Sequence, residues 1–435
     1  MLWFVYNVVF AIGYLLLLPK FGWRMLRRGG YRRGFLQRFA LYSRETRERL
    51  RRQPRVWIHA VSVGETYVAL RVMKEMRAAA PGTAFVLTMT TSTARALAEK
   101  EAHADDVLLY FPCDFPWIVR RALDAIRPAA LLLVECELWP NLIRSAVRRG
   151  LPVVLVNGRI SDASYRGYRK VRLLTRRILP RLRLLLAQTA ADRVRLVELG
   201  ARPECVQVVG TAKYDVTASE AAGCGAAASA LAACGMGPGS LVLLGGSTWP
   251  GEEAALLCAY RALRESFGLL KLVLAPRHVE RRGEVEAEIR RSGLRHVRRS
   301  ELAAGPAPAA PEVLLVDTTG ELRDFYACAS VVFVGKSLTA RGGQNIIEPA
   351  ALGKAIVVGP HLENFAEVAA DFREADALVQ VADADDLTAA LRRLLADEAL
   401  CAEYGRRALA VVRAKRGALR RSVDLIRAAI RTPPP

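Results

Sequence analysis

The chain has 435 residues, of which 52% are hydrophobic and 25% are charged, and this balance excludes a disordered protein and suits two globular domains. Its eight cysteines include no C-x-x-C pair, which excludes the common zinc and redox motifs and predicts a reduced cytosolic protein without disulfides. The formal net charge of +21 calls for an anionic partner, either a membrane surface or a nucleic acid.

Residues 1–19, MLWFVYNVVFAIGYLLLLP, contain no charged side chain. A bilayer-spanning helix needs at least about 17 apolar residues, so this segment has the length either to span a membrane or to lie shallow in its interface. A secretory signal peptide would begin with a basic region and end at a small-residue cleavage site, and both are missing. We therefore predict an uncleaved membrane-anchoring helix over 1–19.

A basic juxtamembrane segment follows at 20–54. Residues 20–55 hold thirteen Lys or Arg against only Glu45 and Glu48. By the positive-inside rule, this cluster predicts that everything downstream lies in the cytoplasm, on the inner face of the membrane. The cluster also predicts binding to anionic lipids of the inner membrane.

An N-terminal Rossmann-like domain is predicted over 55–215, because short apolar runs alternate there with helical patterns, as in a parallel, doubly wound sheet. The predicted strands are 56–60, 84–89, 107–110, 130–135, 152–157, 184–188 and 206–210.

Within this domain, residues 166–183 carry eight Lys or Arg and no acid. Such a run is most often a solvated helix face. Apolar residues such as Leu173 and Ile178 interleave with the arginines, so we favour an amphipathic segment that meets anionic lipid head groups. Nucleic acid is the weaker alternative, because no recognition motif accompanies the charge; we predict no nucleic-acid partner.

Residues 216–239 are rich in Ala and Gly and predict a linker or a loosely packed helix. The alternation then resumes and predicts a second Rossmann-like domain over 240–431, closed by one long helix from about Ala402 to Arg431. Two such domains that face a cleft, with ligands at the carboxyl ends of the strands, form an architecture that many sugar-nucleotide transferases use. The predicted strands of the second domain are 241–244, 271–275, 313–317, 331–334 and 355–358.

In the first domain, two carboxylates follow predicted strands. Ser62 and Glu65 form an S-x-x-E capping box, and the alternative is that Glu65 is a general base for an acceptor hydroxyl. Glu135 directly follows a buried apolar run, where it is either a favourable charge at a helix N-terminus or part of the site.

In the second domain, glycine-rich turns at 245–246 and 342–343 and the Pro276-Arg277-His278 turn predict an anionic nucleotide pocket. Glu348 is a candidate for the ribose hydroxyls, with helix capping as the alternative. Asp383 and Asp385 match the D-x-D pattern that holds a metal in many glycosyltransferases, but N-capping explains them better, so no metal site is predicted.

Several of these segments occur together in one order. They are SVGE at 62–65, ECELWPN at 135–141, NGRISDASYRGY at 157–168, PRH at 276–278, TGEL at 319–322 and RGGQNIIEP at 341–349. With this set, the chain resembles the Kdo transferases, where Kdo is 3-deoxy-D-manno-octulosonic acid.

The resemblance implies a GT-B fold and an inverting, metal-independent transfer of Kdo from CMP-Kdo to a lipid A precursor, lipid IVA, in lipopolysaccharide core biosynthesis. It implies no cofactor. Glu65 would be the general base, and Glu135 and Lys213 would stabilise the transition state. The implied CMP contacts are Pro276, Arg277, Thr319, Gly320, Glu321, Asn345, Ile346, Ile347 and Glu348.

The chain departs from the family pattern at Gln344, where His is usual, at Lys336, which interrupts a Gly-Gly-Ser, and at Gly158, where Ala is commoner. Two other functions compete with this interpretation. One is another GT-B enzyme that uses a UDP-sugar, and the other is a non-enzymatic basic adaptor on a membrane.

Overall fold

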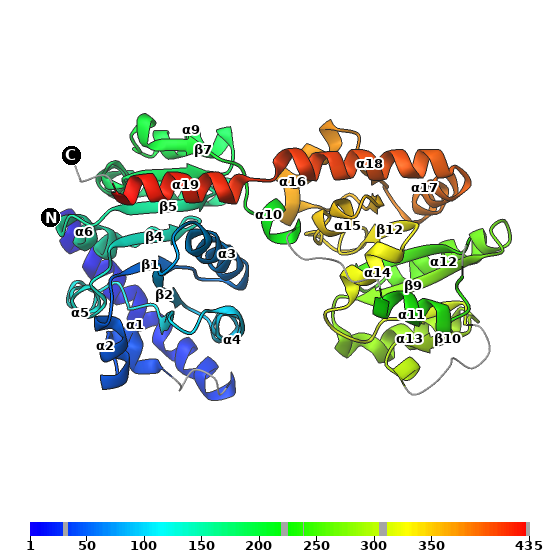
Figure 1. Cartoon of the computed structure of the whole chain (residues 1–435), viewed down its shortest axis with the longest axis horizontal. Helices are drawn as coiled ribbons and strands as arrows, with labels where there is room; N and C mark the ends of the chain where they lie inside the picture. The colour runs from blue at the N-terminus through cyan, green and yellow to red at the C-terminus, as the bar shows by residue number, and fades with distance from the viewer. Residues whose placement is uncertain (29–33, 219–224, 238, 304–310, 432–435) are drawn as a thin grey trace. The chain divides into compact units, whose positions relative to one another are not determined.

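The computed structural model describes residues 1–28, 34–218, 225–237, 239–303 and 311–431. It divides the chain into two compact units, one made of residues 1–216 and 417–435 and the other of residues 217–416. Each unit holds a parallel sheet with helices (Figure 1), as the alternating pattern predicted.

The first unit contains a seven-stranded sheet in the order β3-β2-β1-β4-β5-β6-β7. All neighbouring strands are parallel, and β4 lies in the middle, between β1 and β5. All seven strands were predicted to within a few residues. They are β1 Arg55–His59, β2 Ala84–Met89, β3 Val107–Tyr110, β4 Ala130–Val134, β5 Val153–Gly158, β6 Leu184–Ala187 and β7 Val206–Val208.

Both faces of this sheet are covered, which explains why its strands are continuous apolar runs. Along β1, Trp57 belongs to one buried cluster while Val56 and Ile58 belong to the other. The helices of the first unit, apart from its two terminal helices, are α2 Arg44–Arg51, α3 Val63–Ala79, α4 Ser92–Glu101, α5 Pro116–Ile126, α6 Pro140–Arg148, α7 Asp162–Lys170, α8 Arg172–Ile178, α9 Ala190–Glu198 and α10 Lys213–Ala218, with 3-10 turns η1 Phe35–Phe39, η2 Leu179–Arg181 and η3 Pro203–Cys205.

The second unit repeats the architecture with the order β10-β11-β9-β8-β12-β13-β14. Its two edge strands, β10 and β14, are only three and two residues long and were not predicted. The strands are β8 Leu241–Thr248, β9 Leu270–Pro276, β10 His296–Arg298, β11 Val313–Leu315, β12 Val331–Val334, β13 Ala355–Val358 and β14 Val379–Gln380.

The helices of the second unit begin inside the segment predicted as a linker, since α11 lies within 216–239. They are α11 Gly225–Ala233, α12 Glu252–Arg264, α13 Arg282–Arg291, α14 Leu322–Cys328, α15 Ile347–Ala351, α16 Ala366–Glu374, α17 Ala384–Ala396 and α18 Glu398–Lys415, with 3-10 turns η4 Val279–Arg281, η5 Glu301–Ala303 and η6 Glu363–Phe365.

The prediction of one closing helix within a second domain ending at 431 was wrong. Helix α18 ends at Lys415, Gly417 takes a left-handed φ of 91°, and α19 (Ala418–Arg431) belongs to the first unit. The Asp215 carboxylate accepts hydrogen bonds from the backbone N–H groups of Gly417 and Leu419, at 2.6 and 2.8 Å. The apolar face of α19 then packs into the first core beside α3 (Figure 1).

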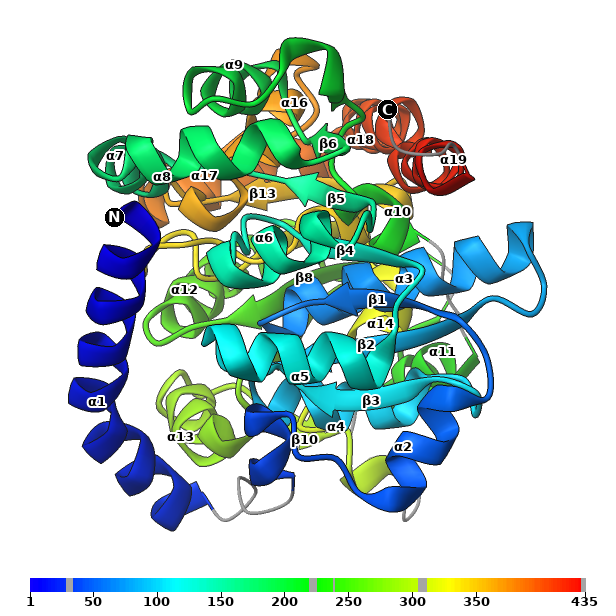
Figure 2. The ribbon, with the colours of Figure 1, turned by 90° about the vertical axis from the view of Figure 1, so that its left-hand side faces the viewer.

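The predicted anchor at 1–19 forms part of helix α1 (Leu2–Arg28), which runs along the side of the first unit (Figure 2). One side of α1 packs on that unit. Tyr6 donates a hydrogen bond to Asp114 at 2.8 Å, and the ring of Phe10 meets that of Phe115 edge-on at 5.1 Å. Within the described residues, no helix combines the length and apolar character needed to cross a membrane, so a spanning anchor is not supported.

Candidate functional site

The turn from β1 to α3 positions Glu65, the predicted general base. Ser62 and Glu65 form the predicted capping box. The Ser62 N–H and hydroxyl donate to Oε1 of Glu65 at 3.3 and 2.7 Å, and the Val61 N–H donates to Oε2 at 2.8 Å. Within the described residues Oε2 accepts no second hydrogen bond, so one lone pair is available to a ligand. Capping and proton acceptance are therefore compatible in this side chain.

Glu135 directly follows β4, Asn157 is the second-last residue of the neighbouring strand β5, and both have left-handed backbones, with φ of 58° and 55°. This conformation is disfavoured for residues with a Cβ and tends to occur at functional sites. The Glu135 N–H donates to the Val156 carbonyl at 2.8 Å. These two residues thus mark the carboxyl edge of the sheet beside Glu65.

Lys213 reaches the same edge because Asn157 fixes the turn before α10. The Asn157 Oδ1 atom accepts a hydrogen bond from the Ala212 N–H at 3.1 Å, and α10 starts at Lys213. Since β1, β4 and β5 are consecutive in the sheet, Glu65, Glu135 and Lys213 gather at one edge of one unit, as expected from strand ends in a parallel sheet.

Glu137 joins these carboxylates and was not predicted as a site residue. Burial, together with the negative charges of Glu65 and Glu135, raises the pKa of Glu137 to about 7. This interaction indicates that the three carboxyl groups lie near one another. The E-x-E pattern in ECELWPN was the available signal.

Aromatic rings line the strand ends next to the carboxylates. His59, at the end of β1, stacks on Phe111 with ring centroids 3.7 Å apart, and Trp139 lies 5.0 Å from Phe111. Burial lowers the pKa of His59 to about 3, so the imidazole is neutral at physiological pH. Its Nε2 atom is buried without a hydrogen-bond partner in the described part of the chain.

In the second unit, the predicted CMP contacts also lie toward the carboxyl edge of the sheet, at the end of β9 and after β11 and β12. Pro276 is buried at the end of β9, whereas Arg277 is exposed. The Arg277 N–H donates to the Thr248 carbonyl at the end of β8, at 3.1 Å.

The segment Thr319 to Glu321 follows β11. Gly320 has a φ of 91° that suits glycine. The Glu321 carboxylate accepts a hydrogen bond from the Thr318 hydroxyl and pairs with Arg299 at 2.9 Å. The Glu321 carboxylate is therefore already hydrogen-bonded and ion-paired within the protein before a nucleotide binds.

Asn345 and Glu348 are hydrogen-bonded to each other at the start of α15. The Asn345 Nδ2 donates to the Glu348 carboxylate at 2.9 Å, and its Oδ1 accepts from the Ile347 N–H at 3.1 Å. The side chains of Ile346 and Ile347 are fully buried. If these two isoleucines contact a nucleotide, they do so through their backbones.

The interpretation of the D-x-D segment as a helix cap is confirmed. The Asp383 Oδ1 accepts hydrogen bonds from the N–H groups of Asp385 and Asp386, at 3.0 and 2.9 Å, at the start of α17.

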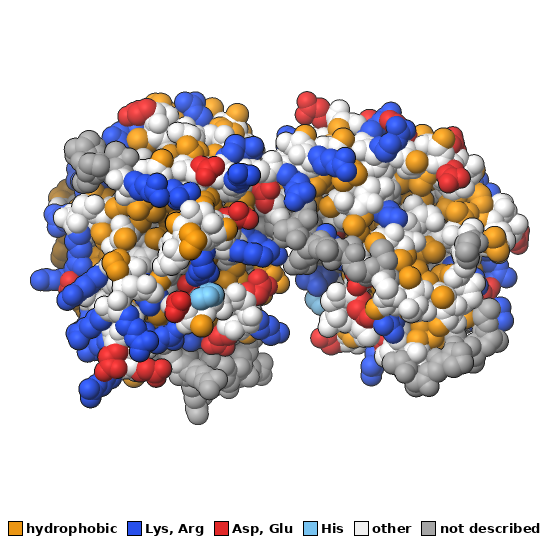
Figure 3. All heavy atoms as spheres, viewed as in Figure 1, with side chains coloured by type: hydrophobic (Ala, Val, Ile, Leu, Met, Phe, Trp, Pro, Cys, Tyr) orange, Lys and Arg blue, Asp and Glu red, His pale blue; other side chains and the backbone are white. Residues whose placement is uncertain are grey.

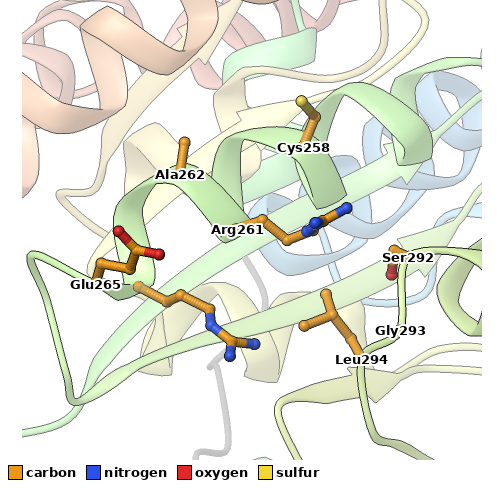
Figure 4. A pocket seen from close by; sticks show the side chains of 8 residues that line it. Cys258, Arg261, Ala262, Glu265, Ser292, Gly293 and Leu294 are labelled. Carbon is orange, nitrogen blue, oxygen red and sulfur yellow. The ribbon is translucent and has the colours of Figure 1, made fainter.

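Two surface hollows lie away from these edges. One of about 610 Å³ is lined by the second half of α12, including Cys258 and Arg261, and by the turn that contains Gly293 (Figure 4). The other, of about 480 Å³, is lined by the starts of β8, β12 and β13, including Leu241 and Ala355. Both lie toward the amino ends of the strands, opposite the predicted site.

Basic side chains are present on the visible surface of each unit (Figure 3). The basic segment 166–183 falls on α7, α8 and η2. Leu173 is exposed there, whereas Ile178 and Leu179 are buried in the core. Arg38, in the other basic segment, is buried and donates to the Thr90 carbonyl at 2.7 Å. Some residues of both segments are thus structural.

A family model and curated relatives indicate one family. A family model described as 3-deoxy-D-manno-octulosonic-acid transferase (kdotransferase) matches residues 33–216. The 3-deoxy-D-manno-octulosonic acid transferase of Bordetella pertussis is 36% identical over 385 residues, 85% of this chain and 86% of that protein. The protein of the same name from Haemophilus influenzae is 28% identical over 427 residues, 98% of each chain.

Among solved structures, UDP-GlcNAc 2-epimerase from Neisseria meningitidis aligns with a TM-score of 0.55 and 13% identity, over 86% of this chain and 99% of its own. At this identity the likeness concerns the fold alone.

Proposed function

Because this chain belongs to the family of Kdo transferases, we propose that it transfers Kdo from CMP-Kdo to a lipid A precursor, lipid IVA, in lipopolysaccharide core biosynthesis. The observation that carries the proposal is the gathering of Glu65, Glu135 and Lys213 at one sheet edge. These are the residues that the family resemblance assigns to catalysis.

In the proposed reaction, Oε2 of Glu65 takes the proton from a sugar hydroxyl of the acceptor. The hydroxyl oxygen then attacks the anomeric carbon of Kdo. The bond from that carbon to the phosphate oxygen breaks, and its electron pair leaves with CMP. Attack from the side opposite the phosphate inverts the anomeric configuration, so no covalent sugar–enzyme intermediate is needed.

The donor carries two anionic groups, the carboxylate of Kdo and the phosphate of CMP. Lys213 suits the carboxylate, because an ammonium group beside it offsets its charge in the transition state. Arg277 suits the phosphate, on which negative charge grows as CMP departs. With cations of the protein in these roles, we propose that the transfer requires no metal ion and that the two units form a GT-B enzyme.

We propose that the enzyme works at the cytoplasmic face of the inner membrane. One side of α1 packs on the first unit, while Phe4, Val9 and Leu16 on the same helix are 72%, 63% and 74% exposed. Exposed apolar side chains on a helix followed by a basic segment are typical of a helix that lies in the membrane interface. This position would keep the enzyme beside its lipid acceptor.

A pair of substitutions tests the role of Glu65. In Glu65→Gln the acceptor hydroxyl loses its base, so we expect kcat for transfer from CMP-Kdo to lipid IVA to fall by a factor of about 10² to 10⁴. Ser62→Ala is the matched control, because it removes the hydroxyl from the same capping box and keeps the carboxylate. It should lower the stability by about 1 kcal/mol and lower kcat less than tenfold.

The measurement is the rate of glycolipid formation, with circular dichroism to check folding. If Ser62→Ala lost as much activity as Glu65→Gln, Glu65 would act only as a cap. If Glu65→Gln retained full activity, the base would be another residue.

A further inference from the structure

Lys336 is a cation in a backbone conformation that favours glycine. It follows β12 with a φ of 55°. Its N–H and those of Ser337 and Leu338 all donate to the buried Glu252 carboxylate, at 2.8 to 2.9 Å. These three hydrogen bonds fix the turn. Lys336 therefore holds a left-handed backbone conformation that is disfavoured for residues with a Cβ. Such strain at a strand end often accompanies a function.

The Lys336 side chain reaches the turn after β8. Its Nζ atom lies 4.4 Å from the centroid of the Trp249 ring, and the His278 ring meets Trp249 nearly edge-on at 5.6 Å. His278 follows Arg277, whose backbone N–H donates a hydrogen bond to the Thr248 carbonyl. The ends of β8, β9 and β12 thus bring Lys336 and His278 to the Trp249 ring, and Arg277 precedes His278 in the chain.

A glycine-rich loop leaves room for this lysine. The Gly343 N–H donates to the Lys336 carbonyl at 2.7 Å, and a Cβ on Gly342 would lie only 3.2 Å from Cε of Lys336. The side chain therefore runs between Trp249 and the loop that was predicted to bind the nucleotide.

The charge of Lys336 is not neutralised within the described residues. No carboxylate there lies within 4.0 Å of its Nζ atom, and the same is true of the Arg277 guanidinium. A partly buried ammonium beside an aromatic ring and glycine backbone is suited to an anion. Together with the exposed Arg277 at the same sheet edge, Lys336 therefore suits a phosphate group.

We propose that Lys336 binds the phosphate of the donor nucleotide, together with Arg277. This inference rests on the proposed use of CMP-Kdo and adds a second phosphate-binding residue to that site. The ammonium would also stabilise the additional negative charge that the phosphate gains when its bond to Kdo breaks.

The test is calorimetric titration of the full-length protein with CMP and with cytidine, which lacks the phosphate. In Lys336→Gly we expect CMP to bind about tenfold more weakly, which is about 1.4 kcal/mol, and cytidine to bind as to the wild type. Because glycine adopts a positive φ readily, the Tm of this variant should not fall. The CMP affinity of the variant should also depend less on salt, because one ionic contact is lost.

Two variants serve as controls. Lys336→Arg keeps the charge and should bind CMP more tightly than Lys336→Gly does. Arg261→Gln removes one exposed charge from α12 at the opposite edge of the sheet and should bind CMP as the wild type does.

Equal CMP affinity in wild type and Lys336→Gly would overturn the inference while leaving the proposed donor intact. Equal weakening of CMP and cytidine would also overturn it, because it would indicate a structural role. If the wild type did not bind CMP at all, both the donor assignment and this inference would fail.

Discussion

At the scale of single residues, left-handed backbones occur at or near the predicted site residues of each unit. Glu135, Asn157, Ser247 and Lys336 have φ values of 54° to 58°, and each lies at or just beyond the carboxyl end of a strand. Hydrogen bonds to neighbouring strands or to buried Glu252 hold several of these turns. At these four positions the backbone strain lies where the proposed substrates would bind.

Asp114 provides a test of the packing of α1 through its pH dependence. This fully buried carboxyl accepts hydrogen bonds from the Tyr6 hydroxyl and from the N–H groups of Asn141 and Leu142, at 2.8 to 2.9 Å. Burial raises its pKa to about 7. Between about pH 4 and 7 the folded protein therefore holds a proton that the unfolded chain, with a pKa of about 3.9, has released.

Ionising Asp114 costs folding free energy, so its contribution to the free energy of unfolding should fall as pH rises from 4 to 7. The slope from one proton is at most about 1.4 kcal/mol per pH unit. In Asp114→Asn, the part of the pH dependence that comes from Asp114 should be absent from the free energies of unfolding measured in urea. This holds however much the substitution lowers the overall stability. Asp124→Asn, which alters a largely exposed carboxyl, is the control, and the same slope in Asp114→Asn and wild type would contradict the expectation.

Local sequence could identify the residues that begin helices or follow strands, but not their neighbours in space. Glu65 and Glu135 were found because each follows a strand that is evident from its apolar run. Lys213 came only from the family resemblance. The proximity of Glu137 to Glu65, and of Lys336 to Trp249, depends on strand order, which no local pattern encodes.

At the scale of elements, the buried strands were predictable because parallel sheets covered on both faces require continuous apolar runs. The edge strands β10 and β14 were missed because two or three residues give no such run. The break between α18 and α19 was missed because Gly417 is a single residue in a helical pattern, and the return to the first unit depends on the distant Asp215.

Helix α1 should bind membranes through its exposed apolar side. We expect the double substitution Phe4→Glu and Leu16→Glu to weaken sedimentation with phosphatidylglycerol-containing vesicles more than tenfold, since each buried apolar side chain contributes about 1.5–3 kcal/mol. Leu269→Glu, which alters an exposed leucine before β9 in the second unit, should sediment as the wild type does. High salt should weaken the remaining binding, because it screens the basic segments.

If the double variant sedimented like the wild type at low and high salt, α1 would not be the membrane contact. Circular dichroism would show whether the first unit is intact, since both side chains point away from its core.

At the scale of the whole molecule, the chain is built from two parallel-sheet units that carry complementary chemistry. The first presents carboxylates, a lysine and aromatic rings at its sheet edge, as an acceptor hydroxyl and a sugar acid require. The second presents Arg277, Lys336 and glycine-rich loops, as a nucleotide phosphate requires. The relatives named as Kdo transferases cover both units, at 85% and 98% of this chain.

The most direct measurement is the product formed by the purified protein from lipid IVA in detergent micelles, analysed by mass spectrometry. With CMP-Kdo as donor, lipid IVA should gain the mass of one or more Kdo residues, at the same rate with and without EDTA. Loss of activity in EDTA and its return with Mg²⁺ would contradict metal independence. Unmodified lipid IVA with CMP-Kdo, together with sugar transfer from a UDP-sugar, would contradict the central claim.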